Sequence, residues 1–373
     1  MRQPFSIATF CAGAAMLVLA ACGSSSSPGT TSNSGNPSGT SDPDLSGPSA
    51  SLTGAGSTFD QPFFTRAFYD YNQKNSGVTV TYASVGSGGG IAQFQAQTVN
   101  FGASDVPMKA SEIAAAKGGT VLQVPVALGG VSISYNLYGV KGGLHLTGAV
   151  LAQIYLGQIK TWNDPAIAAL NSGVTLPSQA ITVIHRSDGS GTSYIFTDYL
   201  STISPAWQSG PGTGKTVKWP VGLGGKGNEG VAGLVKQVSG SIGYVELAYA
   251  LQNNFTYAAM QNAAGSYVEP NLTTVAADAA QKPNVSATDF SIVNQMGSDS
   301  YPISGYSWVL VYQTQTNTDN GTALVKVLDW LTHAGQISDA KPLDYVPLPA
   351  NIQQLARTTL QMVVDSSGKK LLS

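Results

Sequence analysis

Short apolar runs alternate with segments of helical periodicity along most of this chain. From residue 52 onward, runs of five or six mostly apolar residues are typical of buried strands, and the segments between them place apolar residues every three or four positions. We predict strands over 78–83, 99–103, 121–126, 131–135, 181–185, 241–245 and 308–312. Strands that alternate with helices in this way indicate an α/β fold.

The helical pattern is clearest directly after Pro62, a residue suited to the first turn of a helix. The apolar face of this predicted helix consists of Phe63, Phe64, Ala67, Phe68 and Tyr71. Further helices are predicted over 91–97, 148–156, 192–200, 231–238, 322–333 and 351–363. The segment 261–298 is rich in Asn, Ser, Ala and Gly and has no clear assignment.

The first 21 residues have the pattern of a signal peptide. Arg2 precedes an apolar run over 5–20, which is shorter than the roughly 20 residues that a membrane span needs. The run ends in Leu19-Ala20-Ala21-Cys22, which resembles the lipobox of bacterial lipoproteins. This resemblance implies a signal peptide over 1–21 and a lipid-modified Cys22 as the first mature residue. The alternative is an ordinary signal peptide with an incidental cysteine.

The next segment, 22–51, has the composition of a linker. From 23 to 51 every residue except Leu45 and Ala50 is Ser, Gly, Pro, Thr, Asn or Asp. Such a stretch has too little apolar surface to fold, so we expect a disordered Ser/Gly/Pro linker. Together with the lipid anchor it would hold a folded domain near a membrane. Cys11 would leave with the signal peptide, so the mature chain could form no internal disulfide.

Composition excludes several classes of function. The 373 residues include 18 Lys+Arg and 20 Asp+Glu, which gives a net charge of −2 and a charged fraction of 10%, against an average of about 25%. A chain without basic excess lacks the electrostatic footprint of a nucleic-acid-binding protein. Three histidines and two cysteines make a zinc or iron–sulfur site improbable, so no metal or cofactor is expected.

Three glycine-rich loops each precede a predicted helix. They are Gly54-Ala55-Gly56-Ser57-Thr58-Phe59, Val85-Gly86-Ser87-Gly88-Gly89-Gly90 and Arg186-Ser187-Asp188-Gly189-Ser190-Gly191-Thr192. Helix N-termini have unpaired N–H groups and a partial positive charge, and Ser and Thr hydroxyls add donors. A single loop of this kind is more often a plain helix cap. Three of them in a weakly charged chain suggest a bound oxyanion held mostly by neutral dipoles.

Two charged residues could refine this site. Arg186 could supply one full positive charge and be oriented by Asp188, although a surface Arg–Asp pair is the simpler alternative. Asp105 follows a predicted strand at its carboxyl end, where ligands of α/β sheets bind. Its carboxylate could accept a hydrogen bond from a protonated anion and reject a fully ionised one. An Asx-turn before Pro107 explains Asp105 equally well.

Other motifs do not hold up in context. Gly222-Leu223-Gly224-Gly225-Lys226-Gly227 fits a dinucleotide fingerprint, but Trp219-Pro220 stands where a leading strand is needed. Gly210-Pro211-Gly212-Thr213-Gly214-Lys215-Thr216 imitates a P-loop without its first glycine. The chain has no G-x-S-x-G elbow, and we predict His145 in a loop, His185 in a strand and His333 at a helix end. The sequence therefore does not favour an enzyme.

In combination, the loops resemble the phosphate-binding subunit of bacterial high-affinity phosphate ABC transporters. The resemblance runs in order from about Leu52 to the C-terminus. Its motifs are 52–59, Phe101-Gly102-Ala103-Ser104-Asp105, 186–193, 222–230 and Gly240-Ser241-Ile242-Gly243-Tyr244-Val245-Glu246. It implies a type II periplasmic binding protein, with two α/β lobes joined by a hinge and the ligand in the cleft. By this resemblance, lobe 1 is 52–126 plus 304–373, and lobe 2 is 127–303.

The resemblance also implies a ligand set and a role. The phosphate-binding residues would be Ser57, Thr58, Phe59 (through its backbone N–H), Ser87, Asp105, Arg186, Ser190, Gly191 and Thr192, with Asp188 behind Arg186. Some relatives have a second serine at Gly88, a change from which we expect little effect. The chain would be an exported, monomeric, non-enzymatic protein that captures inorganic phosphate and delivers it to a membrane permease.

Other functions remain open at this stage. A secreted phosphoester hydrolase could use the same loops, although the sequence offers no credible nucleophile–base pair. A sensor or surface adhesin could hold phosphate as a structural ligand. Among anions, arsenate is too similar to phosphate to exclude, whereas sulfate and molybdate are disfavoured mainly by Asp105. The identity of the permease and of the membrane that carries the anchor stays open.

Overall fold

The computed structural model describes residues 45–372. The predicted signal peptide, Cys22 and most of the predicted linker lie outside these residues. The linker prediction extends two residues too far, because strand β1 (Ala50–Gly56) already includes Ala50 and Ser51. These two residues pair in parallel with Val78 and Thr79 of strand β2 (Val78–Ser84), and this pairing explains how a polar segment joins the sheet.

The remaining strands vary from two residues to sixteen. They are β3 (Phe101–Ser104), β4 (Val121–Asn136), β5 (His145–Leu146), β6 (Thr182–Arg186), β7 (Leu223–Gly225), β8 (Ser241–Glu246), β9 (Thr256–Tyr257), β10 (Ala259–Gln261), β11 (Tyr267–Val268), β12 (Ser304–Tyr312), β13 (Thr314–Gln315) and β14 (Val364–Asp365).

Most connections between strands contain helices. The helices are α1 (Gln61–Lys74), α2 (Ser87–Gln95), α3 (Ala110–Ala114), α4 (Gly148–Tyr155), α5 (Pro165–Ala168), α6 (Gly191–Ile203), α7 (Pro205–Ser209), α8 (Gly227–Gln237), α9 (Leu247–Gln252), α10 (Leu272–Gln281), α11 (Thr318–Thr332) and α12 (Ala350–Leu360), with a π-helix η1 (Gln336–Ala340) and a 3₁₀ turn η2 (Lys341–Leu343). No helix among residues 45–372 combines the length and apolar character needed to cross a bilayer.

One mixed sheet connects the described chain, in the order β2-β1-β3-β12-β4-β8-β6-β7, with β9 also paired to β4. Strands β1, β2 and β3 are parallel, as are β6, β7 and β8, whereas β12 and β4 run antiparallel to their neighbours. Parallel strands joined through helices confirm the predicted α/β class.

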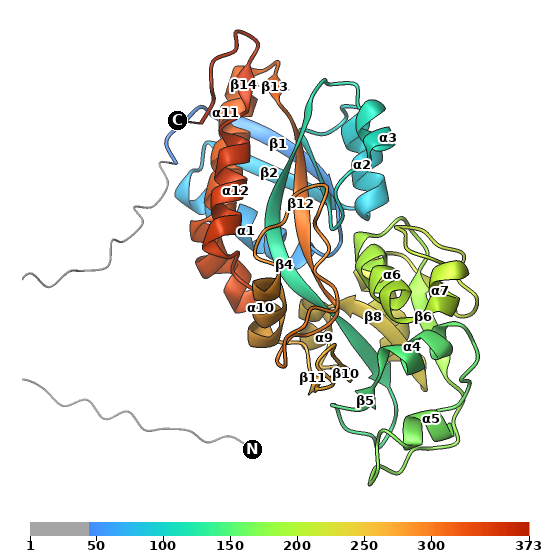
Figure 1. The fold of residues 1–373 in the computed structure, drawn as a ribbon. Helices are drawn as coiled ribbons and strands as arrows, with labels where there is room; N and C mark the ends of the chain where they lie inside the picture. The colour runs from blue at the N-terminus through green and yellow to red at the C-terminus, as the bar shows by residue number, and fades with distance from the viewer. Residues whose placement is uncertain (1–44, 373) are drawn as a thin grey trace, which may run out of the picture. The chain divides into compact units, whose positions relative to one another are not determined.

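Strand β4 belongs to both ends of this sheet. We predicted two strands, 121–126 and 131–135, but the structure has a single strand over Val121–Asn136. Residues 121–130 pair with β12, and residues 131–136 pair with β8. In Figure 1, β4 runs from the β12 side of the molecule down to β8. Gly129 and Gly130, which lie between the two predicted strands, are buried extended residues within β4.

We name the two parts of the sheet by this change of partner. The first sheet half comprises β2, β1, β3, β12 and residues 121–130 of β4; the second comprises residues 131–136 of β4 with β8, β6, β7 and β9. In the first half, α2 packs on β1 and β3, while α11 and α12 pack on β4 and on each other. Figure 1 shows α2 and α11 on opposite sides of the first-half strands.

Each predicted helix corresponds to a helix of the structure, with errors at the ends, but the shorter helices α3, α5, α7 and α9 and the helix α10 were not predicted. The α1 face is buried as predicted, because Phe63, Phe64, Ala67, Phe68 and Tyr71 all face the core. Helix α2 begins four residues before the predicted start, since glycines at 88–90 obscure its periodicity. The unassigned segment 261–298 contains α10, which begins with a capping box at Asn271. His145, predicted in a loop, lies in the short strand β5 and stacks on Tyr267.

Candidate functional site

Four helix N-termini meet where the two sheet halves face each other. They belong to α1 and α2 of the first half and to α6 and α8 of the second. The backbone N–H of Gly191 in α6 donates to Ser87 Oγ in α2 at 3.0 Å. The backbone N–H of Asn228 in α8 donates to Thr58 Oγ1, just before α1, at 3.0 Å. Since each helix start has a partial positive charge, their convergence favours a bound anion.

Asp105 lies among the hydroxyl groups of this convergence. Ser57 Oγ donates to Asp105 Oδ1, and Thr192 Oγ1 donates to Asp105 Oδ2 at 3.1 Å. The backbone N–H of Asp105 donates to Ser87 Oγ at 3.3 Å. The local turn bond before Pro107 is made by Ser104 Oγ, which accepts from the N–H of Val106 at 3.3 Å. The Asx-turn alternative for Asp105 is therefore wrong, because its carboxylate bonds to residues distant in sequence.

Arg186 lies at the end of β6 and is buried, with 2% of its surface exposed. Its Nε donates to Asp188 Oδ1 at 2.8 Å and its Nη2 donates to Asp188 Oδ2 at 2.6 Å, which gives a two-pronged pair. The surface-pair alternative is thus wrong. Nη1 is buried and has no hydrogen-bond partner among the described residues. A buried guanidinium donor without a partner is costly, so this atom points to an acceptor outside the protein.

Electrostatics distinguish the two carboxylates of this site. Burial raises the pKa of Asp105 to about 6, while the hydroxyl bonds from Ser57 and Thr192 and the charge of Arg186 limit the rise. Asp105 is therefore mostly ionised near neutral pH. Although burial opposes it, bonding to Arg186 and to the N–H of Gly227 holds the pKa of Asp188 below its ordinary value. Asp188 thus stays charged and keeps Arg186 oriented.

Two glycines permit the close approach of these loops. A Cβ atom on Gly191 would lie 2.5 Å from Asp105 Cβ, so no other residue fits the first position of α6. Gly86 has φ = +83°, and a Cβ there would lie 2.2 Å from Asp188 Oδ2. Both positions therefore require glycine for the packing of two loops against each other.

The other predicted site residues lie in the same place and are buried. The backbone N–H of Phe59 donates to Ser57 Oγ at 2.9 Å, and the Phe59 ring packs edge-on against Tyr345. Ser190 Oγ caps α6 by accepting from the N–H of Ser193 at 2.9 Å. The Ser190 side chain is thus a helix cap, which was the simpler alternative for a single glycine-rich loop. Ser87 is not such a cap, because its helix has no side-chain cap bond.

Asn228 belongs to this site and was not predicted. Its Nδ2 donates to Thr58 Oγ1 at 2.8 Å and to Thr192 Oγ1 at 3.2 Å. Its Oδ1 accepts from the backbone N–H of Glu246 at 3.0 Å, which fixes the amide orientation. Asn228 follows the 222–227 motif that we set aside as a false dinucleotide fingerprint. That motif forms β7 and the start of α8, so the loop-before-helix rule could have found Asn228.

Ser307 and Asp60 were also missed. Ser307, in the middle of β12, lies 2.6 Å from Asp60 Oδ2 and 3.2 Å from Asp105 Oδ1 through its Oγ. Asp60 is the N-cap residue of α1, but its side chain makes no cap bond and turns into the interior. No sequence pattern predicts that a serine within an apolar strand belongs to a site. An aspartate before a helix is expected to be an ordinary helix cap.

Direct contacts join the two sheet halves around the site. The N–H of Gly88 donates to the carbonyl of Gly189 at 2.8 Å, and Tyr249 Oη donates to the carbonyl of Thr58 at 2.7 Å. At the rim, Lys215 Nζ lies 2.6 Å from Glu112 Oε1. A Cβ on Gly88 would lie 3.1 Å from the Gly189 Cα, so glycine at 88 suits this contact.

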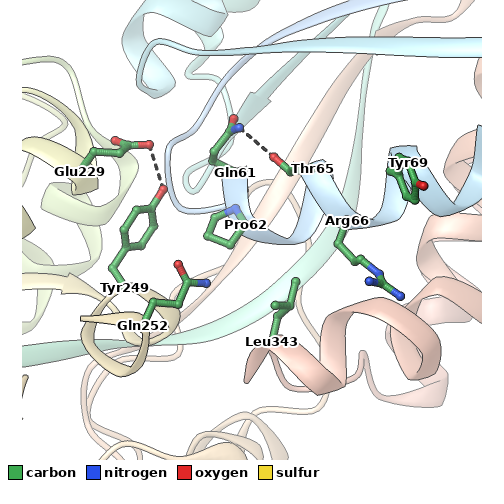
Figure 2. Close-up of a pocket in the computed structure, with 9 residues that line it drawn as sticks. All are labelled: Gln61, Pro62, Thr65, Arg66, Tyr69, Glu229, Tyr249, Gln252 and Leu343. Carbon is green, nitrogen blue, oxygen red and sulfur yellow. Dashed lines mark hydrogen bonds between the residues drawn. The ribbon is translucent and has the colours of Figure 1, made fainter. Parts of the chain in front are cut away.

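A separate pocket begins at Gln61, next to Asp60. It has a volume of about 450 Å³, and Figure 2 shows Tyr249 and Glu229 at one end and Arg66 and Tyr69 at the other. Its lining is mainly apolar, and Arg66 is its only cation and is paired with Asp70. No residue of the predicted anion site lines this pocket. Among residues 45–372 there is also no group of three or more His, Cys, Asp or Glu placed to hold a metal ion.

Comparisons with known proteins show the family of this chain. A model of the PBP superfamily domain matches residues 27–334. The phosphate-binding protein PstS of Pasteurella multocida is 44% identical over 324 residues, covering 86% of this chain and 93% of that one. PstS3 of Mycobacterium bovis is 34% identical, covering 96% and 98% of the two chains.

A solved structure shares the fold. The phosphate-binding protein from Stenotrophomonas maltophilia superposes with a TM-score of 0.65 at 18% identity, covering 87% of this chain and 99% of that one. At such low identity the likeness establishes the fold alone, that of a two-lobe periplasmic binding protein. The sequence relatives establish more, because they are 44% and 34% identical over most of both chains. The chain therefore belongs to the PBP superfamily and, within it, to the family of phosphate-binding proteins named PstS.

Proposed function

We propose that this protein captures inorganic phosphate between its two lobes and delivers it to an ABC permease for import. The observation that carries the proposal is the convergence of four helix N-termini and the unpartnered Nη1 of Arg186 around one acceptor, Asp105. An array of donors with one carboxylate acceptor suits an oxyanion that keeps a proton. The relatives named phosphate-binding proteins support phosphate as that anion.

The proposed ligands are the nine residues that the resemblance implies. Hydroxyl or backbone N–H donors would come from Thr58, Phe59, Ser87, Ser190, Gly191 and Thr192, a charged donor from Arg186, and the acceptor would be Asp105. Ser57, whose hydroxyl donates to Asp105, is the ninth residue of the set. Asn228 is added here, since its amide reaches the hydroxyls of Thr58 and Thr192. All ten residues are buried. Hydrogen bonds to a charged ligand are strong where water is excluded.

The acceptor capacity of Asp105 supports a protonated ligand. An ionised carboxylate offers about four lone-pair positions. Hydroxyls of Ser57, Ser307 and Thr192 lie within bonding distance of the two oxygens. One position is then left, on the Oδ2 side, for a hydroxyl of the bound anion. Sulfate is fully ionised near neutral pH and would meet this position with lone pairs only.

The change of partner along β4 supports the division into lobes. Lobe 1 would comprise 52–126 with 304–373, and lobe 2 would comprise 127–303, so β4 and the segment before β12 would form the hinge. The β4 partner changes between Gly130 and Val131, close to this boundary. Hinge closure would bring the four helix starts together on phosphate and exclude water.

The proposed location is outside the cytoplasm, with the processed chain attached to a membrane through lipid on Cys22. The support is the signal-peptide pattern over 1–21 and the lipobox-like sequence before Cys22. The closed lobes would dock on the permease, and the protein would act as a monomer without enzymatic activity. The membrane that carries the anchor depends on the cell envelope of the organism.

Calorimetric titration of ligand-stripped protein tests the proposal. The described residues 45–372 lie within one compact unit, so the protein without its first 41 residues is used for the measurement. We expect tight one-to-one binding of phosphate and no heat with sulfate. Binding of sulfate alone would overturn the choice of anion, and no heat with either anion would overturn the binding function. A parallel assay with a phosphoester should detect no hydrolysis.

A further inference from the structure

Asp60 is a buried carboxylate next to the site that the proposed ligand set does not use. Its side chain is fully buried at the start of α1, where an aspartate ordinarily caps the helix. Here it makes no cap bond, so the helix N-terminus gives the carboxylate no hydrogen bond. Oδ2 contacts Ser307 Oγ at 2.6 Å, and Oδ1 has no hydrogen-bond partner among the described residues.

Ser307 connects this carboxylate to Asp105. Its Oγ lies 2.6 Å from Asp60 Oδ2 and 3.2 Å from Asp105 Oδ1. A serine hydroxyl has one proton and can donate to only one of the two oxygens. The second contact is favourable only if that carboxyl group carries a proton and donates to Ser307 Oγ. One of the two aspartates must therefore be protonated.

The surroundings decide which aspartate keeps the proton. Asp105 accepts bonds from Ser57 and Thr192 and feels the charge of Arg186, all of which favour its ionised form. Asp60 has a single hydroxyl partner, and an ionised Asp60 would leave a bare charge on a buried oxygen. The proton therefore belongs on Asp60.

The other charged and titratable groups that face Asp60 point the same way. Glu246 is a further buried carboxylate, and Tyr82 and Tyr345 are buried phenols. Burial, followed by the charge of Asp105, raises the pKa of Asp60 well above its ordinary value. Arg186 is the only buried Lys or Arg among residues 45–372, and Asp188 already pairs with it. No cation is left to compensate an ionised Asp60.

We propose that Asp60 is a positioning residue for phosphate recognition: it is held protonated, donates to Ser307 Oγ, and thereby directs the Ser307 hydroxyl proton onto Asp105. Asp105 is then anionic, with three of its lone-pair positions filled by protein hydroxyls and the fourth aimed at the ligand. The inference rests on the proposed function for its consequence, but the protonation of Asp60 is a property of the protein without ligand.

The conservative variant Asp60→Asn tests whether Asp60 acts as a protonated donor to Ser307 or as an ionised acceptor. The Asn amide can donate to Ser307 Oγ as the protonated acid does, so phosphate affinity near about pH 6.5 should stay within about threefold of the wild-type value. Asp60→Ala removes the donor and should weaken binding by roughly tenfold or more. A loss of that size in Asp60→Asn would overturn the proposal.

The pH profile gives a readout that a merely structural role would not change. As pH rises into the alkaline range, ionisation of Asp60 in the wild-type protein would place a second charge beside Asp105 and weaken phosphate binding. Asp60→Asn has no such proton to lose. Ionisation of phosphate and of Glu246 affects both proteins equally and therefore cancels in the ratio of the variant's phosphate affinity to that of the wild-type protein. This ratio should increase with pH. A ratio that stays constant with pH would contradict the proposal.

Infrared spectroscopy tests the proton directly and needs no ligand. The wild-type protein near neutral pH should show a carbonyl stretching band of a protonated carboxylic acid that Asp60→Asn removes. Ser307→Ala should shift this band, which also keeps the test decisive if Asp60→Asn folds poorly. The exposed Asp319→Asn is the control and should leave it unchanged. If phosphate fails to bind but the band is present, the proposed function fails and the assignment of the proton stands.

Discussion

The chemistry of the site depends on single side chains whose charge state is set by burial. Asp105 is buried but faces several hydroxyls and Arg186, so it stays available as a charged acceptor. Asp278 on α10 is buried without such partners, and neither of its carboxylate oxygens has a hydrogen-bond partner among the described residues. The same residue type therefore has opposite roles: Asp105 is the acceptor of the proposed anion site, whereas Asp278 is a cost to stability.

Replacing Asp105 by Asn should reduce selectivity among anions. The Asn side chain can donate to an oxyanion without a proton, whereas the carboxylate meets it with lone pairs only. We expect the ratio of phosphate to sulfate affinity to fall by at least about tenfold, equivalent to roughly 1.4 kcal/mol. Titrations with each anion measure this ratio. A variant that rejects sulfate as strongly as the parent protein does would show that selectivity arises elsewhere.

Replacing Asp278 by Asn should change how stability depends on pH. Burial raises the pKa of Asp278 to about 8, from 3.8 for an exposed group. The protonated group is accommodated at low pH, and the fold loses stability as pH rises from about 4 to about 8. Between pH 5 and pH 9 the variant should gain on the wild-type protein by on the order of 4 kcal/mol. Thermal unfolding at both pH values measures this gain, and the exposed Asp299→Asn should show none.

At the scale of elements, glycine allows helices to begin inside the site. Helix α6 starts at Gly191 against Asp105, and helix α8 starts at Gly227, whose N–H donates to Asp188 Oδ1 at 3.0 Å. Hydrophobic periodicity predicted α1, α4, α6 and α12 well, because each has an apolar face buried in the core. It placed the start of α2 too late, since glycines carry no hydrophobic signal.

The substitution Gly191→Ala should disrupt the site while leaving the helix intact. Its Cβ would lie 2.5 Å from Asp105 Cβ, so the two loops must move apart. We expect phosphate affinity to fall by roughly tenfold or more, although alanine is the better helix former. Gly233→Ala in α8 is the matched control, because a Cβ there meets nothing within 4 Å. It should bind phosphate normally and gain up to about 1 kcal/mol in stability. Equal behaviour of the two variants would contradict the packing argument.

At the scale of the whole molecule, function depends on contacts between residues far apart in sequence. Glu112 lies in α3 of the first sheet half and Lys215 in the loop after α7, yet their charged groups are 2.6 Å apart. Burial lowers the pKa of Lys215, and the bond to Glu112 opposes this effect. This ion pair exists only when the two sheet halves face each other closely. It is therefore suited to hold the closed form.

Breaking this ion pair should speed the release of phosphate. Lys215→Met or Glu112→Gln should each raise the dissociation rate by roughly threefold to tenfold, with a smaller effect on association. The double variant should release phosphate no faster than the faster single variant, because both remove the same interaction. Rapid-mixing kinetics provide the measurement, with the exposed Lys236→Met as control. Additive effects of the two substitutions would show that the residues act independently.

The sequence by itself determined the α/β class, most of the helices and the three loops that precede α1, α2 and α6. These features are local: periodicity reports which face is buried, and glycine beside Ser or Thr before a helix reports a donor-rich start. The sequence also identified Asp105, Arg186 and Asp188, but it left a surface pair and an Asx-turn open. Only the burial of these side chains and their hydrogen-bond partners, some of them distant along the chain, could exclude the surface pair and the Asx-turn.

The tertiary structure alone decided which loops meet and which buried polar groups lie within hydrogen-bond distance. It joined two predicted strands into β4 and brought Asn228 to Thr58 across 170 residues. It also placed Ser307 between Asp60 and Asp105, although no local pattern marks that serine. The physical reason is that the charge state of a buried group depends on its three-dimensional neighbours. Hydrophobic patterning determines which residues are buried, but not which buried polar groups share a hydrogen bond.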